Sequence, residues 1–148
     1  MAKCESVQVR FLGRDRIDVE FEFEAQLVKG IKITEMSGCS GFERAARTLV
    51  EQINRDKNWP TAWVGADHAA ILLRELVLRA EGRFQLPYRE PELCHCRAVP
   101  TEVVDRAIVS GCHSIESVAR CTSAGTSCGT CKPDTEKLIA YRLNERLS

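Results

Sequence analysis

Hydrophobic and polar residues alternate along the first part of the chain. Apolar residues occupy every second position in three stretches, at residues 7–11, 17–23 and 31–33. Lys29 and Gly30 stand before the third stretch and form a turn signal. A period of two is typical of strands that have one buried face. The pattern therefore predicts three antiparallel strands, of which the first two form a hairpin.

A helical period replaces this alternation after Cys39, which has a glycine on either side within two residues. Within residues 42–53 the apolar residues recur three and four positions apart, with charged residues between them. A second helix is expected to start near Asp67, and its dense apolar content predicts that it covers the sheet. We therefore predict an α+β domain at residues 1–81, with a three-stranded antiparallel sheet and two helices.

Apolar periodicity lapses at residues 82–92, which we interpret as a linker. Gly82, Pro87 and Pro91 interrupt any helix in this segment. Beyond it, short apolar periods separated by helix caps predict a small all-helical domain at residues 93–148. The expected boundaries of its helices are Gly111 at the end of the first, Ser114 at the start of the second and Pro133 in the first turn of the last.

Charge and hydropathy exclude several classes of function. Among the 148 residues, 21 lysines and arginines balance 21 aspartates and glutamates, so no positive field points to nucleic acid or an acidic membrane surface. No basic, apolar leader with a cleavage site opens the sequence, and no apolar run reaches about 18 residues. We expect a cytoplasmic protein that binds neither nucleic acid nor a membrane.

Eight cysteines point to metal or redox chemistry. In a reducing compartment such clusters indicate a metal or redox site rather than a disulfide framework. Four of them form two tight pairs, Cys94 with Cys96 and Cys128 with Cys131, which predicts one metal site. On these residues alone an iron–sulfur cluster, a zinc ion and a redox disulfide remain open. Zinc is disfavoured because four-cysteine zinc sites usually pair two CxxC motifs.

The spacing of these cysteines resembles a known family. CHC at residues 94–96 is followed after 31 residues by CGTC at 128–131, with Ala-Gly-Thr-Ser directly before it. This pattern resembles the bacterioferritin-associated ferredoxin domain, which binds a 2Fe-2S cluster and also occurs as the central domain of NifU and in nitrite reductases. The resemblance covers about residues 93–143. It implies that Cys94, Cys96, Cys128 and Cys131 are the cluster ligands.

The amino-terminal part resembles the scaffold domain of the NifU and IscU proteins, on which iron–sulfur clusters are assembled. The resemblance rests on the order of three strands and a helix and on the turn at residues 38–41. That scaffold uses three cysteines, and only Cys39 matches one of them, while Gly65 stands about where the third is expected. The resemblance therefore implies a degenerate scaffold domain kept for packing or for docking a partner.

The remaining candidate residues are expected to have structural roles. Cys39 is predicted to be a small buried thiol near a helix start, or alternatively a thiol made reactive by the helix N-terminus. Cys112 and Cys121 border the second small helix and are expected to be ordinary core thiols. His95 lies between two predicted ligands and is expected to be a neighbour of the cluster that tunes its potential.

The expected function is electron transfer linked to iron–sulfur cluster assembly or iron mobilisation. No nucleophile paired with a base, phosphate loop or open three-ligand metal site is recognisable, so the chain is expected to be no enzyme. One alternative is an assembly factor that hands iron, sulfur or cluster to apo-proteins. Another is a structural zinc module for protein interaction. The expected partners are redox or iron–sulfur assembly proteins, and a homodimer is left open.

Overall fold

The chain folds into two compact units. The computed structural model describes residues 2–11, 14–63 and 65–144. The first unit ends at residue 84, and the second begins at residue 85 and also includes residues 66–68. Within the described part of the chain, no helix is both long and apolar enough to span a membrane. The domain boundaries expected from the sequence stay a prediction.

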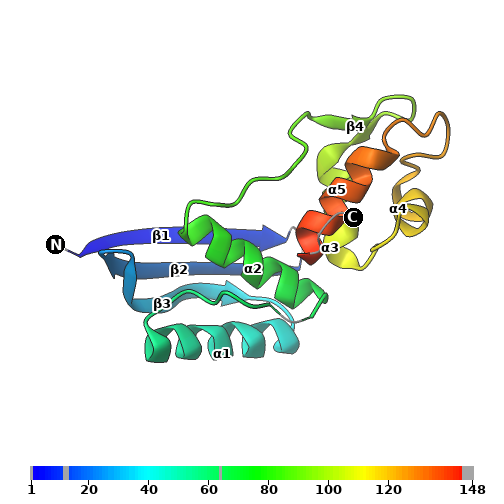
Figure 1. Cartoon of the computed structure of the whole chain (residues 1–148). Coiled ribbons are helices and arrows are strands. Elements are labelled where there is room, and N and C mark those ends of the chain that lie inside the picture. Colours follow the sequence, from blue (N-terminus) through cyan, green and yellow to red (C-terminus); the bar gives the residue numbers. More distant parts are fainter. Residues whose placement is uncertain (1, 12–13, 64, 145–148) are drawn as a thin grey trace. The chain divides into compact units, whose positions relative to one another are not determined.

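The first unit contains a three-stranded antiparallel sheet, as predicted (Figure 1). Its central strand buries every second residue from Asp15 to Phe21, because only one face of the sheet is covered. Val19 lies opposite Val7 on one neighbour and Ile33 on the other. The strands in spatial order are β1 (Lys3–Phe11), β2 (Asp15–Glu24) and β3 (Leu27–Ser37).

The turn between β2 and β3 differs from the prediction. It is formed by Ala25 and Gln26, whose φ angles of 51° and 68° are both positive, as a two-residue hairpin turn requires. The turn predicted at Lys29 and Gly30 is wrong, since both residues lie inside β3. At this point the side chain of Asn54 accepts from the N–H of Ile31 at 2.8 Å and donates to its C=O at 2.9 Å. These bonds satisfy the backbone of β3 along its outer edge.

Two helices cover the buried face of the sheet, which confirms the predicted α+β class. Cys39 caps the first helix, and its Sγ accepts from the N–H of Phe42 at 3.4 Å. Cys39 is exposed, so the expectation of a buried thiol is wrong. Trp59 packs edge-on against Phe21, with ring centroids 5.3 Å apart. The helices are α1 (Ser40–Asp56) and α2 (His68–Ala80).

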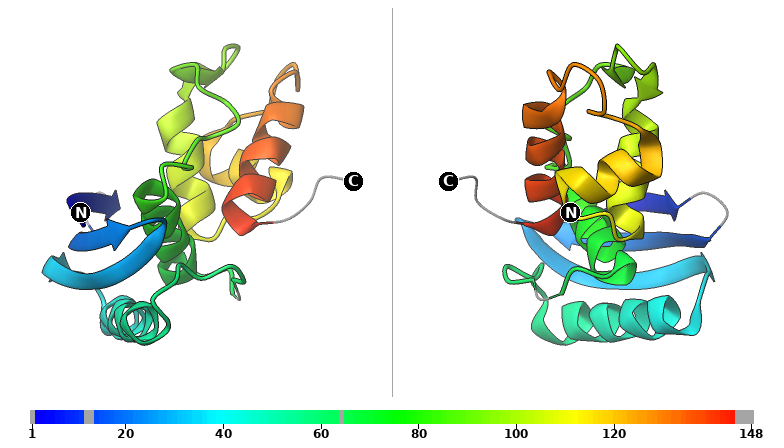
Figure 2. Two further views of the ribbon diagram at one scale, coloured as in Figure 1. Left: turned by 60° about the vertical axis from the view of Figure 1, so that its left-hand side comes forward. Right: turned by 90° about the vertical axis from the view of Figure 1, so that its right-hand side faces the viewer.

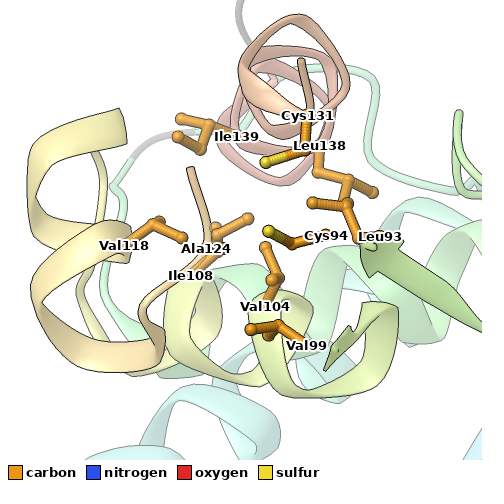
Figure 3. Close-up of a cluster of buried hydrophobic side chains, with 10 residues drawn as sticks. All are labelled: Leu93, Cys94, Val99, Val104, Ile108, Val118, Ala124, Cys131, Leu138 and Ile139. Atoms are coloured by element: carbon orange, nitrogen blue, oxygen red, sulfur yellow. The ribbon is translucent and has the colours of Figure 1, made fainter. Parts of the chain in front are cut away.

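The second unit packs three helices around one apolar cluster (Figure 3). As predicted, Gly111 ends the first helix, and Ser114 begins the second with a capping box to Ser117. Leu138 and Val104 are fully buried at the centre of this cluster. The helices are α3 (Thr101–Ser110), α4 (Ile115–Thr122) and α5 (Lys132–Leu143).

This unit is largely helical rather than all-helical. A short antiparallel pair precedes α3, formed by β4 (Glu92–Cys94) and β5 (Val99–Pro100). The chain reverses between them through Ala98, whose φ is 52°. Two strands this short carry no recognisable alternation, so the period of the sequence does not reveal them.

The end of the predicted linker packs on the second unit. Leu86 and Tyr88 contact the apolar cluster, and the hydroxyl of Tyr88 donates to the C=O of Glu92 at 2.9 Å. The N–H of Gln85 donates to the hydroxyl of Tyr141, also at 2.9 Å. These contacts hold the segment that leads into β4 against α5.

Candidate metal centre

Two loops at one end of the second unit bring the four predicted ligands together. Cys94 is the last residue of β4, and Cys96 lies in the turn after it. Cys128 lies in the loop before α5, and Cys131 is the N-cap of α5. All views in Figures 1 and 2 show the β4–β5 turn and this second loop at the same end of the three helices.

The spacing of the sulfur atoms suits metal ligation. The Sγ atoms of Cys94 and Cys96 are 3.7 Å apart, and those of Cys96 and Cys128 are 3.4 Å apart. Two thiolates on one tetrahedral metal, with bonds of about 2.3 Å, lie about 3.8 Å apart. An iron of a 2Fe-2S cluster and a zinc ion both accept such a set of thiolates. The chemistry of the residues present, four thiols with two neighbouring sulfur pairs at these distances, therefore fits a thiolate-bound metal centre.

The centre has a buried side and an exposed side. Cys94 and Cys131 are 1% and 5% exposed, whereas Cys96 and Cys128 are exposed. Figure 3 shows the sulfur atoms of Cys94 and Cys131 projecting into the same space within the apolar cluster. Water is excluded from the inner side of the centre, while its outer side is open to a partner.

The two buried thiols differ in their tendency to ionise. Burial acts to raise the pKa of Cys94, but hydrogen bonds from the backbone N–H groups of Gly125 and Arg97 outweigh it and the pKa is lowered. The thiols of Cys96 and Cys131 add hydrogen bonds in the same direction. Burial, followed by the hydrogen bond and the charge of Cys94, raises the pKa of Cys131 to about 11. Of these two thiols, Cys94 therefore loses its proton first, because hydrogen-bond donors surround its sulfur.

The loop before α5 supplies positive electrostatics to the centre. Gly125 and Gly129 have φ angles of 77° and 75°, in the left-handed region that favours glycine. The side chain of Lys132 lies beside both glycines. A Cβ added at Gly125 would lie 3.4 Å from its Cγ, and a Cβ added at Gly129 would lie 3.5 Å from its Cε. The N-terminus of α5 begins at the same place, and its dipole favours negative charge.

Two neighbours of the sulfurs have side-chain contacts that spacing does not reveal. The Sγ of Cys128 and the Oγ1 of Thr130 are 3.0 Å apart. The Nδ1 of His95 lies 2.8 Å from a carboxylate oxygen of Glu92. The side chain of His95 is exposed and that of Glu92 is half-buried. No periodicity marks Thr130 or Glu92, and only their closeness in sequence to the cysteines points to them.

The four remaining cysteines lie outside this centre. Cys4 and Cys39 are exposed in the first unit. Cys112 and Cys121 form a pair of their own, with their Sγ atoms 2.7 Å apart. Cys112 is half-buried against the apolar cluster, but Cys121 is exposed, so the expectation that both are core thiols is wrong for Cys121.

Comparisons with known proteins agree with the chemistry of this centre. Residues 93–141 match the family described as BFD-like [2Fe-2S] binding domain. A segment of 52 residues is 36% identical to Nitrite reductase [NAD(P)H] of Bacillus subtilis (strain 168), and it covers 34% of this chain and 6% of that enzyme. No solved structure matches the chain. The cofactor expected from the sequence is confirmed, and residues 93–141 form a BFD-like domain that binds a 2Fe-2S cluster.

Proposed function

We propose that the chain is an electron-transfer protein, in which Cys94, Cys96, Cys128 and Cys131 ligate the 2Fe-2S cluster. The observation that carries this proposal is the division of the centre into a buried and an exposed pair of thiols. Electrons pass between proteins only over short distances, so a centre with one side open to solvent suits exchange with a partner. When bound, the cluster supplies a site for one electron at a time.

The residues around the sulfurs have separate parts in this function. Cys94 and Cys131 hold the inner side of the centre within the apolar cluster and keep water away from it. The backbone N–H groups that bond Cys94 and the positive charge of Lys132 offset the negative charge of four thiolates. Hydrogen bonds to the sulfur atoms and a nearby positive charge both raise the reduction potential of such a cluster.

The similarity to nitrite reductase supports a redox role. That enzyme is named for a reduction that uses NAD(P)H, and the matched segment is 6% of its length. In the chain described here, the segment outside residues 93–141 includes the sheet unit, whose likeness to the NifU and IscU scaffold stays a prediction. We propose that the sheet unit docks redox or iron–sulfur assembly partners and that the chain catalyses no reaction alone.

Spectroscopy of protein purified without air tests the cofactor and its redox activity together. We expect a brown protein with about two irons per chain, which gives an electron paramagnetic resonance signal after dithionite and none before it. A cluster that dithionite does not reduce would overturn the electron-transfer proposal. A colourless protein with about one zinc would leave a structural zinc module instead.

Serine variants of the two exposed cysteines test the ligand set. Cys96→Ser and Cys128→Ser change surface positions, so the apolar cluster stays intact. We expect each to lower the iron content at least severalfold and to alter the spectrum. Cys121→Ser, in the same unit and also exposed, is the matched control and should retain iron and spectrum. Full iron content with an unchanged spectrum in Cys96→Ser would overturn the ligand assignment.

Delivery of cluster to apo-proteins is a second candidate function, favoured by the exposure of Cys39 at the start of α1. An exposed thiol at a helix N-terminus suits a transient acceptor. In this case Cys39→Ser should slow transfer of cluster to an apo-ferredoxin while the spectrum of the chain is unchanged. Cys4→Ser is the control, because Cys4 is exposed in the same unit. Equal transfer rates for the two variants and the wild type would exclude this role of Cys39.

A further inference from the structure

The second unit contains a pair of cysteines that the metal centre does not use. The Sγ atoms of Cys112 and Cys121 are 2.7 Å apart, although nine positions separate these residues in sequence. Cys112 follows the end of α3, and Cys121 lies in the last turn of α4. A disulfide bond is about 2.05 Å long, so the sulfurs need to move by less than 1 Å to reach bonding distance.

We propose that Cys112 and Cys121 form a reversible disulfide by exchange with a small-molecule disulfide such as oxidised glutathione. This pair would be a second redox site, distinct from the cluster. It takes up and releases two electrons, whereas the cluster exchanges one at a time. The disulfide would link the end of α3 to the last turn of α4.

The backbone on either side keeps the two thiols close to each other. The N–H of Cys112 donates to the C=O of Ala107 at 3.0 Å, and Gly111 ends α3 with a φ of 127°. The capping box of Ser114 then fixes the start of α4. Val118, which is fully buried, holds α4 against the apolar cluster. The approach of the thiols therefore depends on regular helix ends and packing rather than on a mobile loop.

The surroundings of the two thiols assign them different parts in the exchange. Cys121 is exposed and can be reached by a small disulfide. Burial, followed by the hydrogen bond and the charge of Cys121, raises the pKa of Cys112 to about 11, while the charge of Arg120 acts in the opposite direction. At neutral pH Cys112 is therefore protonated, and the first attack falls to Cys121. The positive charge of Arg120 also favours the approach of glutathione, which carries carboxylates.

The exchange takes place in two steps. The thiolate of Cys121 attacks one sulfur of oxidised glutathione, the S–S bond of glutathione breaks, and one glutathione leaves as thiolate and takes up a proton. Cys121 is then held as a mixed disulfide without negative charge, so its charge no longer opposes ionisation of Cys112. Cys112 gives its proton to solvent and attacks the sulfur of Cys121, which releases the second glutathione. Two thiols are oxidised and one glutathione disulfide is reduced to two glutathiones.

Peptide mapping of the full chain with its cluster bound tests this proposal. The protein is incubated with oxidised glutathione under nitrogen, free thiols are blocked with N-ethylmaleimide in denaturant, and the chain is cut with trypsin. Cleavage after Arg106 and Arg120 places Cys112 in peptide 107–120 and Cys121 in peptide 121–137. We expect these two peptides to appear joined and without attached glutathione, and to separate after treatment with dithiothreitol. The absorption spectrum of the cluster is recorded before and after.

Two serine variants make the outcome decisive. In Cys112→Ser, glutathione should remain attached to Cys121 as a stable mixed disulfide, because no second thiol displaces it. In Cys121→Ser, the joined peptides should disappear. Joined peptides that persist in Cys121→Ser would assign the bond to Cys128 or Cys131, which peptide 121–137 also contains, and would overturn the proposal. Free thiols at both positions in the wild-type chain after the incubation would overturn it as well.

Discussion

Arg142 and Asp105 join α5 to α3 through a two-pronged ion pair. The Nε and one terminal nitrogen of Arg142 each donate to a different carboxylate oxygen of Asp105, both at 2.7 Å. The side chain of Arg142 is 6% exposed and that of Asp105 is 17% exposed. Cys131 is the N-cap of α5, and α3 follows directly after β5, so this pair joins the two helices that follow the two cysteine loops.

Replacing Asp105 with alanine is expected to destabilise the second unit by about 3 kcal/mol, because the change removes the carboxylate from a buried guanidinium. Unfolding in urea, followed by circular dichroism, measures this loss. We also expect faster release of iron to a chelator, since the two cysteine loops lose a shared support. The double variant Asp105→Leu with Arg142→Leu should be less destabilised than Asp105→Ala, since the buried guanidinium is removed together with its carboxylate.

An exposed ion pair on the same helix provides the control. Glu102 and Arg106 lie 2.9 Å apart on α3, with side chains 71% and 42% exposed. Glu102→Ala should change stability by less than about 0.5 kcal/mol, as is common for surface pairs. Equal losses for Glu102→Ala and Asp105→Ala would contradict the role given to the buried pair.

The sequence predicts those elements whose own residues determine them. The alternation in β2 and the caps at Gly111 and Ser114 are local signals. The structure has a strand at the first, the end of α3 at Gly111 and the start of α4 at Ser114. The turn at Ala25 and Gln26 was not predictable in the same way, since neither residue favours a positive φ. It forms because the pairing of β2 with β3 and the contact of Asn54 with β3 outweigh local preference.

In the candidate centre, too, local spacing predicts one part of the structure and tertiary packing determines the rest. The spacing of the cysteines predicts that Cys94, Cys96, Cys128 and Cys131 converge, and they do. Which two are buried depends on residues distant in sequence, such as Val104 and Leu138, and spacing does not show it. The approach of Cys112 to Cys121 also depends on packing, because nothing in their spacing distinguishes them from separate core thiols.

Gly125→Ala is expected to weaken the centre. The φ of 77° at Gly125 is unfavourable for a residue with a Cβ, and the cost of adopting it is about 1–2 kcal/mol. We expect a lower free energy of unfolding and faster iron loss to a chelator, since the N–H of Gly125 bonds the sulfur of Cys94. Gly41→Ala is the control, since Gly41 lies in α1 with no atom within 4 Å of an added Cβ. It should leave stability unchanged or raise it by up to about 1 kcal/mol.

Lys132→Gln is expected to lower the reduction potential of the cluster. The Nζ of Lys132 would lie 3.8 Å from a Cβ added at Gly129, in the loop that carries Cys128. Its positive charge stabilises the reduced state, which carries one more negative charge. A single exposed charge near the centre is expected to shift the potential by on the order of 30 mV at low salt, and by less at high salt. A redox titration followed by electron paramagnetic resonance measures the shift. Lys137→Gln, on the same helix but more than one turn further along, is the control, and equal shifts in both variants would contradict the argument.

Alkylation of Cys112 is expected to accelerate steadily with pH. Burial raises the pKa of this thiol to about 11, so roughly one chain in a thousand carries the thiolate at pH 8. Between pH 7 and pH 10 the rate of reaction with iodoacetamide should rise about tenfold per unit, because the thiolate is the reacting form. The rate is measured on peptide 107–120, in which Cys112 is the one cysteine. In urea the same peptide should reach a plateau above about pH 9, since an unfolded thiol has a pKa near 8.5. A plateau at that pH in the folded protein would show that burial of Cys112 does not control its ionisation.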